Sequence, residues 1–159
     1  MMNTEIERKF LVTKDDYRSA AFKISSIVQG YILRSPKKSV RVRIKDDEAF
    51  LTIKGESSSD GLTRFEWEKQ ISVEDAQALI KLCEPGVIIK KRYHIKSGSH
   101  VFEVDEFSGD HIGLVIAEVE LNSPDESFER PEWLGKEVTG DVRYYNAYLS
   151  EHPFRQQAI

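Results

Sequence analysis

The chain has 159 residues, 40% of them hydrophobic and 31% charged, so it is long enough for one compact domain and too short for two of ordinary size. Its 23 Lys and Arg residues against 27 Asp and Glu residues give a formal net charge of -4. This balance excludes the overall positive field that attracts long nucleic acids or anionic membranes. The charged fraction still exceeds the roughly 25% of an average soluble domain, so the sequence raises the question of where this charge lies.

Cysteine content and the N-terminal segment predict the compartment. The lone Cys83 excludes an intramolecular disulfide and a cysteine zinc site, and we expect it to be a buried thiol. Residues 1–9 carry charges where a signal peptide needs an apolar core, and no run approaches the roughly 18 apolar residues of a membrane span. We expect a cytoplasmic protein with neither a membrane nor a long nucleic acid as partner, built as a single domain over residues 1–159.

Alternation of apolar and polar residues predicts strands throughout the first half of the chain. They are expected over 5–12, 27–34, 40–45, 49–54 and 62–71, with a short helix over 14–20 between the first two. Residues 55–61 are rich in Gly and Ser and predict a hairpin loop. Residues 73–83 follow with apolar side chains at helical spacing. We expect a helix there, with Ser72 as its N-cap and Pro85 beyond its end.

The second half continues with strands and ends in a helix. Three more strands are expected over 87–95, 100–107 and 114–121. Residues 124–139 are interrupted by proline and glycine, which predicts brief turns. A final helix is expected after the turn at 140–141, with Tyr144, Ala147, Tyr148 and Leu149 on one face. Because most strands are joined by hairpin-length gaps, we expect antiparallel pairing and an α+β class.

The predicted strands carry their charges on one face. In the strand over 40–45, Arg41 and Arg43 alternate with Val40, Val42 and Ile44. The same alternation places on one face Glu5, Glu7 and Lys9; Lys54; Arg64, Glu66 and Glu68; Lys90 and Arg92; Glu103 and Asp105; and Glu118 and Glu120. An antiparallel sheet with one solvated face explains this pattern without further assumptions.

A closed barrel with a charged interior is the alternative. Like charges at alternate positions of one strand repel, so a face that is nearly all ionised is costly unless counter-charges lie opposite. Eight antiparallel strands can close into a barrel with room inside for side chains or one small ligand. Such an interior would suit a small, highly anionic ligand that is carried with a divalent metal. The alternation alone leaves both geometries open.

The motifs of the charged strands occur in the order of a known family. The segment Glu5-x-Glu7-x-Lys9 resembles the ExExK signature of the CYTH superfamily, the triphosphate tunnel metalloenzymes. Further matching motifs are QGYI at 29–32, RVR at 41–43, LTIK at 51–54, RFEWE at 64–68, KKRY at 90–93, EVDEFSG at 103–109, AEVEL at 117–121 and WLGKEVTGD at 133–141. The resemblance implies a closed eight-stranded tunnel with a few exterior helices. It also implies an inorganic or organic triphosphate as substrate, bound with Mg²⁺ or Mn²⁺.

The resemblance further implies roles for particular residues. The phosphate-binding cations would be Lys9, Arg41, Arg43, Lys54, Lys90 and Arg92. The metal ligands would be Glu5, Glu7, Glu118 and Glu120, with Asp105 as a further candidate, in keeping with the preference of hard divalent cations for carboxylate oxygens. The catalytic step would involve Tyr31, Lys54, Glu66 and Glu68, with Tyr31 acting beside a lysine as general base. Two alternatives stay open: Tyr31 as an aromatic of the barrel wall, and the acids Glu66, Glu68, Glu103 and Asp105 as metal ligands, as groups that position water, or as partners that hold the arginines.

These roles predict metal-dependent hydrolysis of a triphosphate with release of phosphate. Inorganic tripolyphosphate is the first expected substrate and nucleoside triphosphates are the second. The alternatives are adenylate cyclase of class IV type and thiamine triphosphatase, the two activities for which the superfamily is named. A non-catalytic polyphosphate-binding module is disfavoured, because a pure anion binder has no need of the carboxylates.

Two further expectations concern the outside of the barrel. Apolar outer faces with few helices to cover them would favour a homodimer. The four histidines, His94, His100, His111 and His152, have no metal-binding spacing and are expected at the surface or the rim, with His94 within reach of the tunnel mouth.

Overall fold

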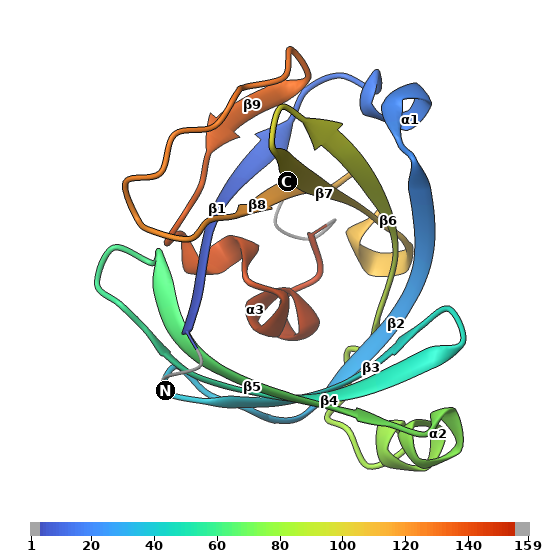
Figure 1. Ribbon diagram of the computed structural model, residues 1–159. Coiled ribbons are helices and arrows are strands. Elements are labelled where there is room, and N and C mark those ends of the chain that lie inside the picture. Colours follow the sequence, from blue (N-terminus) through green and yellow to red (C-terminus); the bar gives the residue numbers. More distant parts are fainter. Residues whose placement is uncertain (1–3, 155–159) are drawn as a thin grey trace.

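Eight antiparallel strands close into a barrel, and a ninth strand extends one of them (Figure 1). The computed structural model describes residues 4–154, so both ends of the domain predicted over 1–159 lie outside the described residues. The strands are β1 (Thr4–Val12), β2 (Lys23–Arg34), β3 (Ser39–Lys45), β4 (Glu48–Ser57), β5 (Thr63–Ile71), β6 (Ile88–Ser97), β7 (His100–Phe107), β8 (Val115–Glu120) and β9 (Leu134–Glu137). Around the barrel they follow the order β5-β4-β3-β2-β6-β7-β8-β1, and β1 pairs with β5 to close the ring. The predicted class and the closed eight-stranded tunnel are confirmed.

Strand β9 shows that the expectation of only brief turns over 124–139 was wrong. One edge of β1 pairs with two strands. Residues Thr4–Ile6 at the start of β1 pair with β5, and residues Phe10–Val12 at its end pair with β9. Its other edge pairs with β8. Gly135 interrupts the alternation of apolar and polar residues in this strand, so the pattern did not predict it. A Cβ at Gly135 would lie 2.7 Å from the Leu11 carbonyl oxygen, so the close approach of the two strands requires glycine there.

Short helices lie outside the barrel or at one of its ends. They are α1 (Tyr17–Ala20), α2 (Val73–Ile80) and α3 (Asn146–Glu151), with 3₁₀ turns at Gly109–His111 and Val142–Tyr144. The predicted N-cap is confirmed, since Ser72 Oγ accepts a hydrogen bond of 3.0 Å from the Asp75 amide. Helix α2 ends three residues before the predicted boundary at Cys83, because the chain continues from Ile80 in tighter turns. Tyr144 belongs to a 3₁₀ turn and not to the final helix.

The apolar faces of the strands point outward and are covered in part. On one side, Phe10, Phe102 and Trp133 are buried together with Tyr17 of α1. On the other side, Ala76 of α2 packs against the outer face of β3 and β4. Three apolar side chains on the outer face of β4 and β5 keep 37–49% of their surface exposed: Ile53, Phe65 and Trp67. The homodimer expected from such faces stays a prediction.

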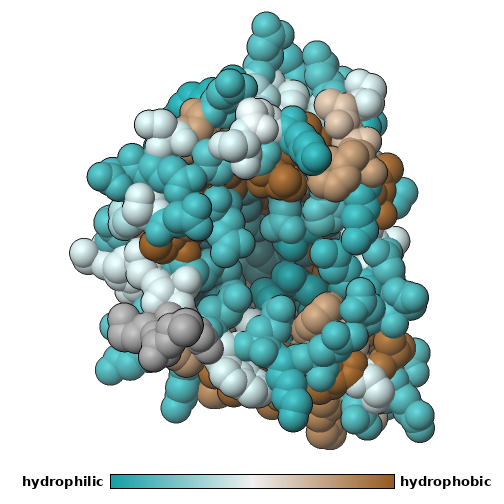
Figure 2. All heavy atoms as spheres, in the orientation of Figure 1, coloured by the Kyte–Doolittle hydropathy of each residue, from teal (hydrophilic) through white to brown (hydrophobic). Residues whose placement is uncertain are grey.

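Helix α3 lies across one end of the barrel (Figure 1). Its Leu149 is buried against Ile88, Phe107, Leu114 and Ile116, and we call these five residues the apolar plug. Figure 2 shows a hollow lined by hydrophilic residues within the ring of strands. The charged interior therefore has an apolar floor. No helix among residues 4–154 is long and apolar enough to cross a membrane.

Gly86 allows the chain before β6 to pass close to α3. It has a φ of +99°, and a Cβ there would lie 1.7 Å from the Ser150 carbonyl oxygen. We expect Gly86→Ala to lower the free energy of unfolding by about 3 kcal/mol, since it adds a backbone clash to conformational strain. Gly109→Ala is the matched control, because Gly109 also has a positive φ of +63° but nothing lies within 4 Å of its Cβ position. Urea unfolding of both variants tests this, and equal losses would contradict the role of the close approach.

Candidate active site

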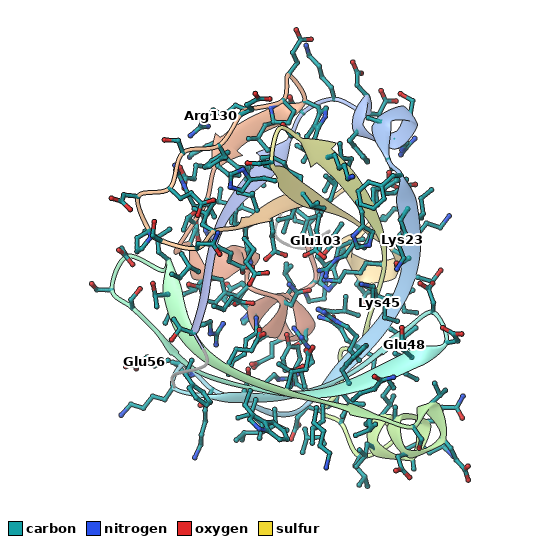
Figure 3. All side chains as sticks on the ribbon, in the orientation of Figure 1. Lys23, Lys45, Glu48, Glu56, Glu103 and Arg130 are labelled. Atoms are coloured by element: carbon teal, nitrogen blue, oxygen red, sulfur yellow. The ribbon has the colours of Figure 1, made fainter. Side chains whose placement is uncertain are left out.

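Lysine and arginine side chains occupy inward positions on four strands of the barrel. They are Lys9 on β1, Arg41 and Arg43 on β3, Lys54 on β4, and Lys90 and Arg92 on β6. Four of them are buried, with exposed fractions of 7% for Lys9, 8% for Arg41, 1% for Lys90 and 7% for Arg92. In Figure 3, side chains that carry nitrogen and oxygen atoms project into the barrel interior. Charges this deeply buried are stable only with counter-charges or bound anions.

Carboxylates inside the barrel neutralise some of these cations. Asp105 accepts two hydrogen bonds from Arg92, of 2.8 and 2.9 Å, and lies 2.7 Å from Lys90 Nζ. Burial raises the pKa of Asp105, but Arg92 and Lys90 outweigh it and hold the pKa far below its usual range. Lys54 Nζ lies 2.9 Å from Glu5 and 3.5 Å from Glu66. Because both oxygens of Asp105 contact cations, its surroundings favour the role of holding the cations over the predicted metal-ligand role.

Arg41 keeps a free donor inside the barrel. Its Nη2 donates to Thr52 Oγ1 over 3.2 Å, and Thr52 Oγ1 donates to Glu68 over 2.7 Å. Among the described residues, Nε of Arg41 is the only buried side-chain nitrogen or oxygen atom that lacks a hydrogen-bond partner. An unsatisfied buried donor costs roughly 1–3 kcal/mol, so an acceptor bound beside Arg41 would relieve this cost.

Arg43 is held by a neutral partner. Its Nε donates to Gln29 Oε1 over 2.8 Å, and within residues 4–154 no carboxylate forms an ion pair with it. Burial, followed by the neighbouring charges of Arg41 and Arg92, lowers the pKa of Arg43 to about 9. The guanidinium therefore stays charged at neutral pH and retains its full attraction for an anion.

Two pairs of carboxyl groups inside the barrel influence each other's pKa. Burial, and then the charges of Glu118 and Glu5, raise the pKa of Glu7 well above its usual range. Burial also opposes ionisation of Glu118, but Lys9 and the hydrogen bond from Glu7 lower its pKa overall. In the second pair, burial and a hydrogen bond with Glu5 raise the pKa of Glu66 to about 7. The surroundings of Glu7 therefore oppose its ionisation, whereas those of Glu118 favour it.

The donor chemistry of these acids fits a divalent metal. A cation bound between two buried carboxyl groups favours their ionised forms, and hard cations prefer carboxylate oxygens. Strands β1 and β8 are paired in register, with Glu7 opposite Glu120 and Lys9 opposite Glu118. Within the part of the chain that the structure describes, no three His, Cys, Asp or Glu side chains are already gathered as a metal-binding group. The fit therefore rests on the pair of Glu7 and Glu118.

Charged side chains also surround the tunnel mouth. Figure 3 places Glu103 close to the middle of the opening, with Lys23 and Lys45 along its side. His94 Nδ1 lies 3.8 Å from Glu103, as expected of a histidine within reach of the mouth. The side chains of Glu103 and Glu120 border a pocket of about 510 Å³.

Two expectations about single residues were wrong. His111, expected at the surface or the rim, is buried with an exposed fraction of 6%. His111 is enclosed because its Nδ1 accepts a hydrogen bond of 3.0 Å from the Phe154 amide. Cys83 is partly exposed instead of buried, because it lies beyond the end of α2.

The structure brings together most of the residues expected in the site and adds three more. Tyr31 is buried on β2 and lies opposite Arg41 in the strand register, so both of its alternative roles stay open. Sequence reasoning assigned no role to three polar residues that contact the cations: Gln29, Thr52 and Asn146. The shared alternation of Gln29 with Tyr31 and of Thr52 with Lys54 was a usable signal. Asn146 lies in the last helix, and no pattern in the sequence indicated a role for it.

The raised pKa of Glu66 predicts how stability depends on pH. A carboxyl whose pKa is higher in the folded than in the unfolded chain stabilises the fold below the unfolded pKa, and this contribution is lost as pH rises through the folded pKa. With chelator present, we therefore expect this contribution of Glu66 to fall as pH rises from about 4.5 through about 7. Thermal unfolding of the parent and Glu66→Gln across this range measures it. A Glu66→Gln profile parallel to that of the parent would contradict the assignment.

A barrel closed by eight strands, with buried cations and carboxyl groups inside, defines a charged tunnel of the kind that handles small polyanions. The family model described as CYTH domain matches residues 3–146, and the chain belongs to this family. The family membership expected from the motifs is thereby confirmed.

Relatives of known name span nearly the whole chain. An inorganic triphosphatase of Acetivibrio thermocellus is 46% identical over 155 residues, covering 97% of each chain. A second inorganic triphosphatase, from Nitrosomonas europaea, is 38% identical over 152 residues, covering 92% of this chain and 97% of the relative. The crystal structure of the inorganic triphosphatase NE1496 superimposes with a TM-score of 0.65 at 36% identity, covering 92% of this chain and 93% of that one.

Proposed function

We propose that this protein hydrolyses inorganic tripolyphosphate to pyrophosphate and phosphate in a metal-dependent reaction inside the tunnel. The observation that carries the proposal is the group of buried cations that the protein leaves incompletely paired, above all Arg41 with its unsatisfied Nε among the described residues and Arg43 without a carboxylate. A small linear polyanion supplies the missing acceptors. The names of the two relatives, at 46% and 38% identity, support the same activity.

The cations bind the phosphate chain in this proposal. Arg41 and Arg43 lie on one strand and offer planar guanidinium groups, which can donate two parallel hydrogen bonds to a phosphate. Lys9, Lys54, Lys90 and Arg92 add charge from the strands around them. Asp105 holds Lys90 and Arg92 in place and reduces their mutual repulsion.

Glu7 and Glu118 would hold Mg²⁺ or Mn²⁺, with Glu5 and Glu120 next to them on β1 and β8. Such a metal, when bound, polarises phosphate oxygens and neutralises the charge that develops on them. Because a carboxyl group must be ionised to bind a metal, a metal held by Glu7 would oppose the rise in the pKa of this group.

The reaction adds water to the terminal phosphorus and breaks its bond to the bridging oxygen, which leaves with pyrophosphate. Lys54, Glu66 and Glu68 lie together on β4 and β5, and we assign them to orienting this water and accepting its proton. Tyr31 is the alternative acceptor. Positioning and charge stabilisation supply most of the acceleration, as in other phosphoryl transfers.

A panel of substrates tests the proposal. Phosphate release is measured from tripolyphosphate, ATP and thiamine triphosphate, each with Mg²⁺, with Mn²⁺ and with chelator. We expect fastest release from tripolyphosphate and none with chelator. Formation of pyrophosphate and a cyclic nucleotide from ATP would instead indicate a cyclase, and tight tripolyphosphate binding without turnover would indicate a binding module.

A further inference from the structure

A chain of hydrogen bonds joins two of the buried cations through two amide side chains. Arg43 Nε donates to Gln29 Oε1 over 2.8 Å, and Gln29 Nε2 donates to Asn146 Oδ1 over 3.1 Å. The same Asn146 oxygen accepts a hydrogen bond of 2.9 Å from Lys90 Nζ. Gln29 and Lys90 have exposed fractions of 0% and 1%, so these bonds are shielded from water. This series of hydrogen bonds thus fixes the positions of Arg43 and Lys90 relative to each other.

The amide partners differ from those of the other cations. Lys54 and Arg92 are held by carboxylates, and Lys90 contacts Asp105 in addition to Asn146. A carboxylate positions the cation but also cancels much of its charge. An amide oxygen accepts the same hydrogen bonds without a net charge. Arg43 is therefore fixed in place while its charge remains available.

The C-terminal segment supplies further neutral acceptors. Asn146 is the first residue of α3, and the Tyr144 carbonyl oxygen just before it accepts a hydrogen bond of 3.2 Å from Lys9 Nζ. The segment that closes one end of the barrel with Leu149 therefore also contacts the cations. A segment reserved for closing the barrel would need only apolar residues.

We propose that Gln29 and Asn146 are positioning residues that hold Arg43 and Lys90 for phosphate binding through neutral hydrogen bonds, and so make α3 part of the binding site. This inference rests on the proposed triphosphatase function. It assigns a role in substrate affinity to two residues that touch the cations and not the reacting atoms.

The test compares a charge change inside the chain of hydrogen bonds with one outside it. Asn146→Asp keeps an acceptor for both Gln29 and Lys90 but adds a negative charge. Gln29→Glu keeps the acceptor for Arg43 and adds a negative charge beside it, but it loses the donor to Asn146. The matched control is Gln77→Glu on the exposed face of α2. Affinity for tripolyphosphate is measured by titration calorimetry with chelator present, and the melting temperature is recorded for each variant.

We expect both Asn146→Asp and Gln29→Glu to weaken tripolyphosphate binding at least tenfold while their melting temperatures stay close to that of the parent. Turnover with metal should show the loss mainly in KM, since neither residue acts in the chemical step. Gln77→Glu should bind as the parent does.

A folded Asn146→Asp variant with parental affinity would overturn the inference, because a merely structural amide tolerates the added charge. If Asn146→Asp does not fold, Gln29→Glu carries the same comparison. A parent protein that neither binds tripolyphosphate nor releases phosphate from it with Mg²⁺ or Mn²⁺ would instead overturn the proposed function, and the inference with it. The behaviour of the parent protein therefore distinguishes failure of the inference from failure of the proposed function.

Discussion

Replacing Glu118 by glutamine is expected to lower metal-dependent turnover of tripolyphosphate by at least about 10²–10³-fold, the loss seen when a preorganised electrostatic group is removed from an active site. Glu118 is the ionised member of the carboxyl pair with Glu7, and its charge also faces Lys9 and Arg92. The amide keeps the shape of the side chain but binds a divalent metal weakly. Phosphate release with saturating Mg²⁺ or Mn²⁺ measures the loss.

The control for this variant is Glu74→Gln, which makes the same change in the exposed first turn of α2. It should retain parental activity. Full activity in Glu118→Gln, or in Glu118→Ala, would show that the assignment of the metal site is wrong.

The second large effect is expected on stability. Arg92→Met removes the cation that donates two hydrogen bonds to Asp105 and that lies near Glu103 and Glu118. Asp105 then keeps only Lys90 as a close counter-charge, and breaking a buried pair in this way costs about 3–5 kcal/mol. For a chain of this size, the melting temperature should fall by roughly 10 °C, and phosphate binding should be lost as well.

Lys91→Met provides the comparison for Arg92→Met, because Lys91 is the next residue on β6, points out of the barrel and is exposed. Its effect on thermal unfolding should be small. A melting temperature of Arg92→Met equal to that of Lys91→Met would mean that Lys90 alone is sufficient to compensate the charge of Asp105.

The inward face of each strand could be predicted because strands have a fixed side-chain period of two. Arg41 and Arg43 on β3, or Glu118 and Glu120 on β8, were placed on one face by alternation alone. Closure of the sheet could not be derived this way, since a solvated open sheet shows the same alternation. The family motifs supplied the missing information.

Partner choice inside the barrel was beyond the sequence. Arg92 and Arg43 both point into the barrel, yet Arg92 is held by Asp105 and Arg43 by Gln29. These choices depend on the register between strands and on which side chains meet across the barrel. Asn146 shows the limit most clearly, since its partner Gln29 lies 117 residues earlier in the chain.

The apolar plug has a kinetic consequence for a tunnel that carries out hydrolysis. With Leu149 and its neighbours closing one end, substrate entry and product exit must share the mouth beside Glu103. Each turnover then ends with two anions leaving by the path along which the next substrate arrives. Phosphate and pyrophosphate thus become natural competitors of tripolyphosphate, and the rate of their departure can limit the cycle.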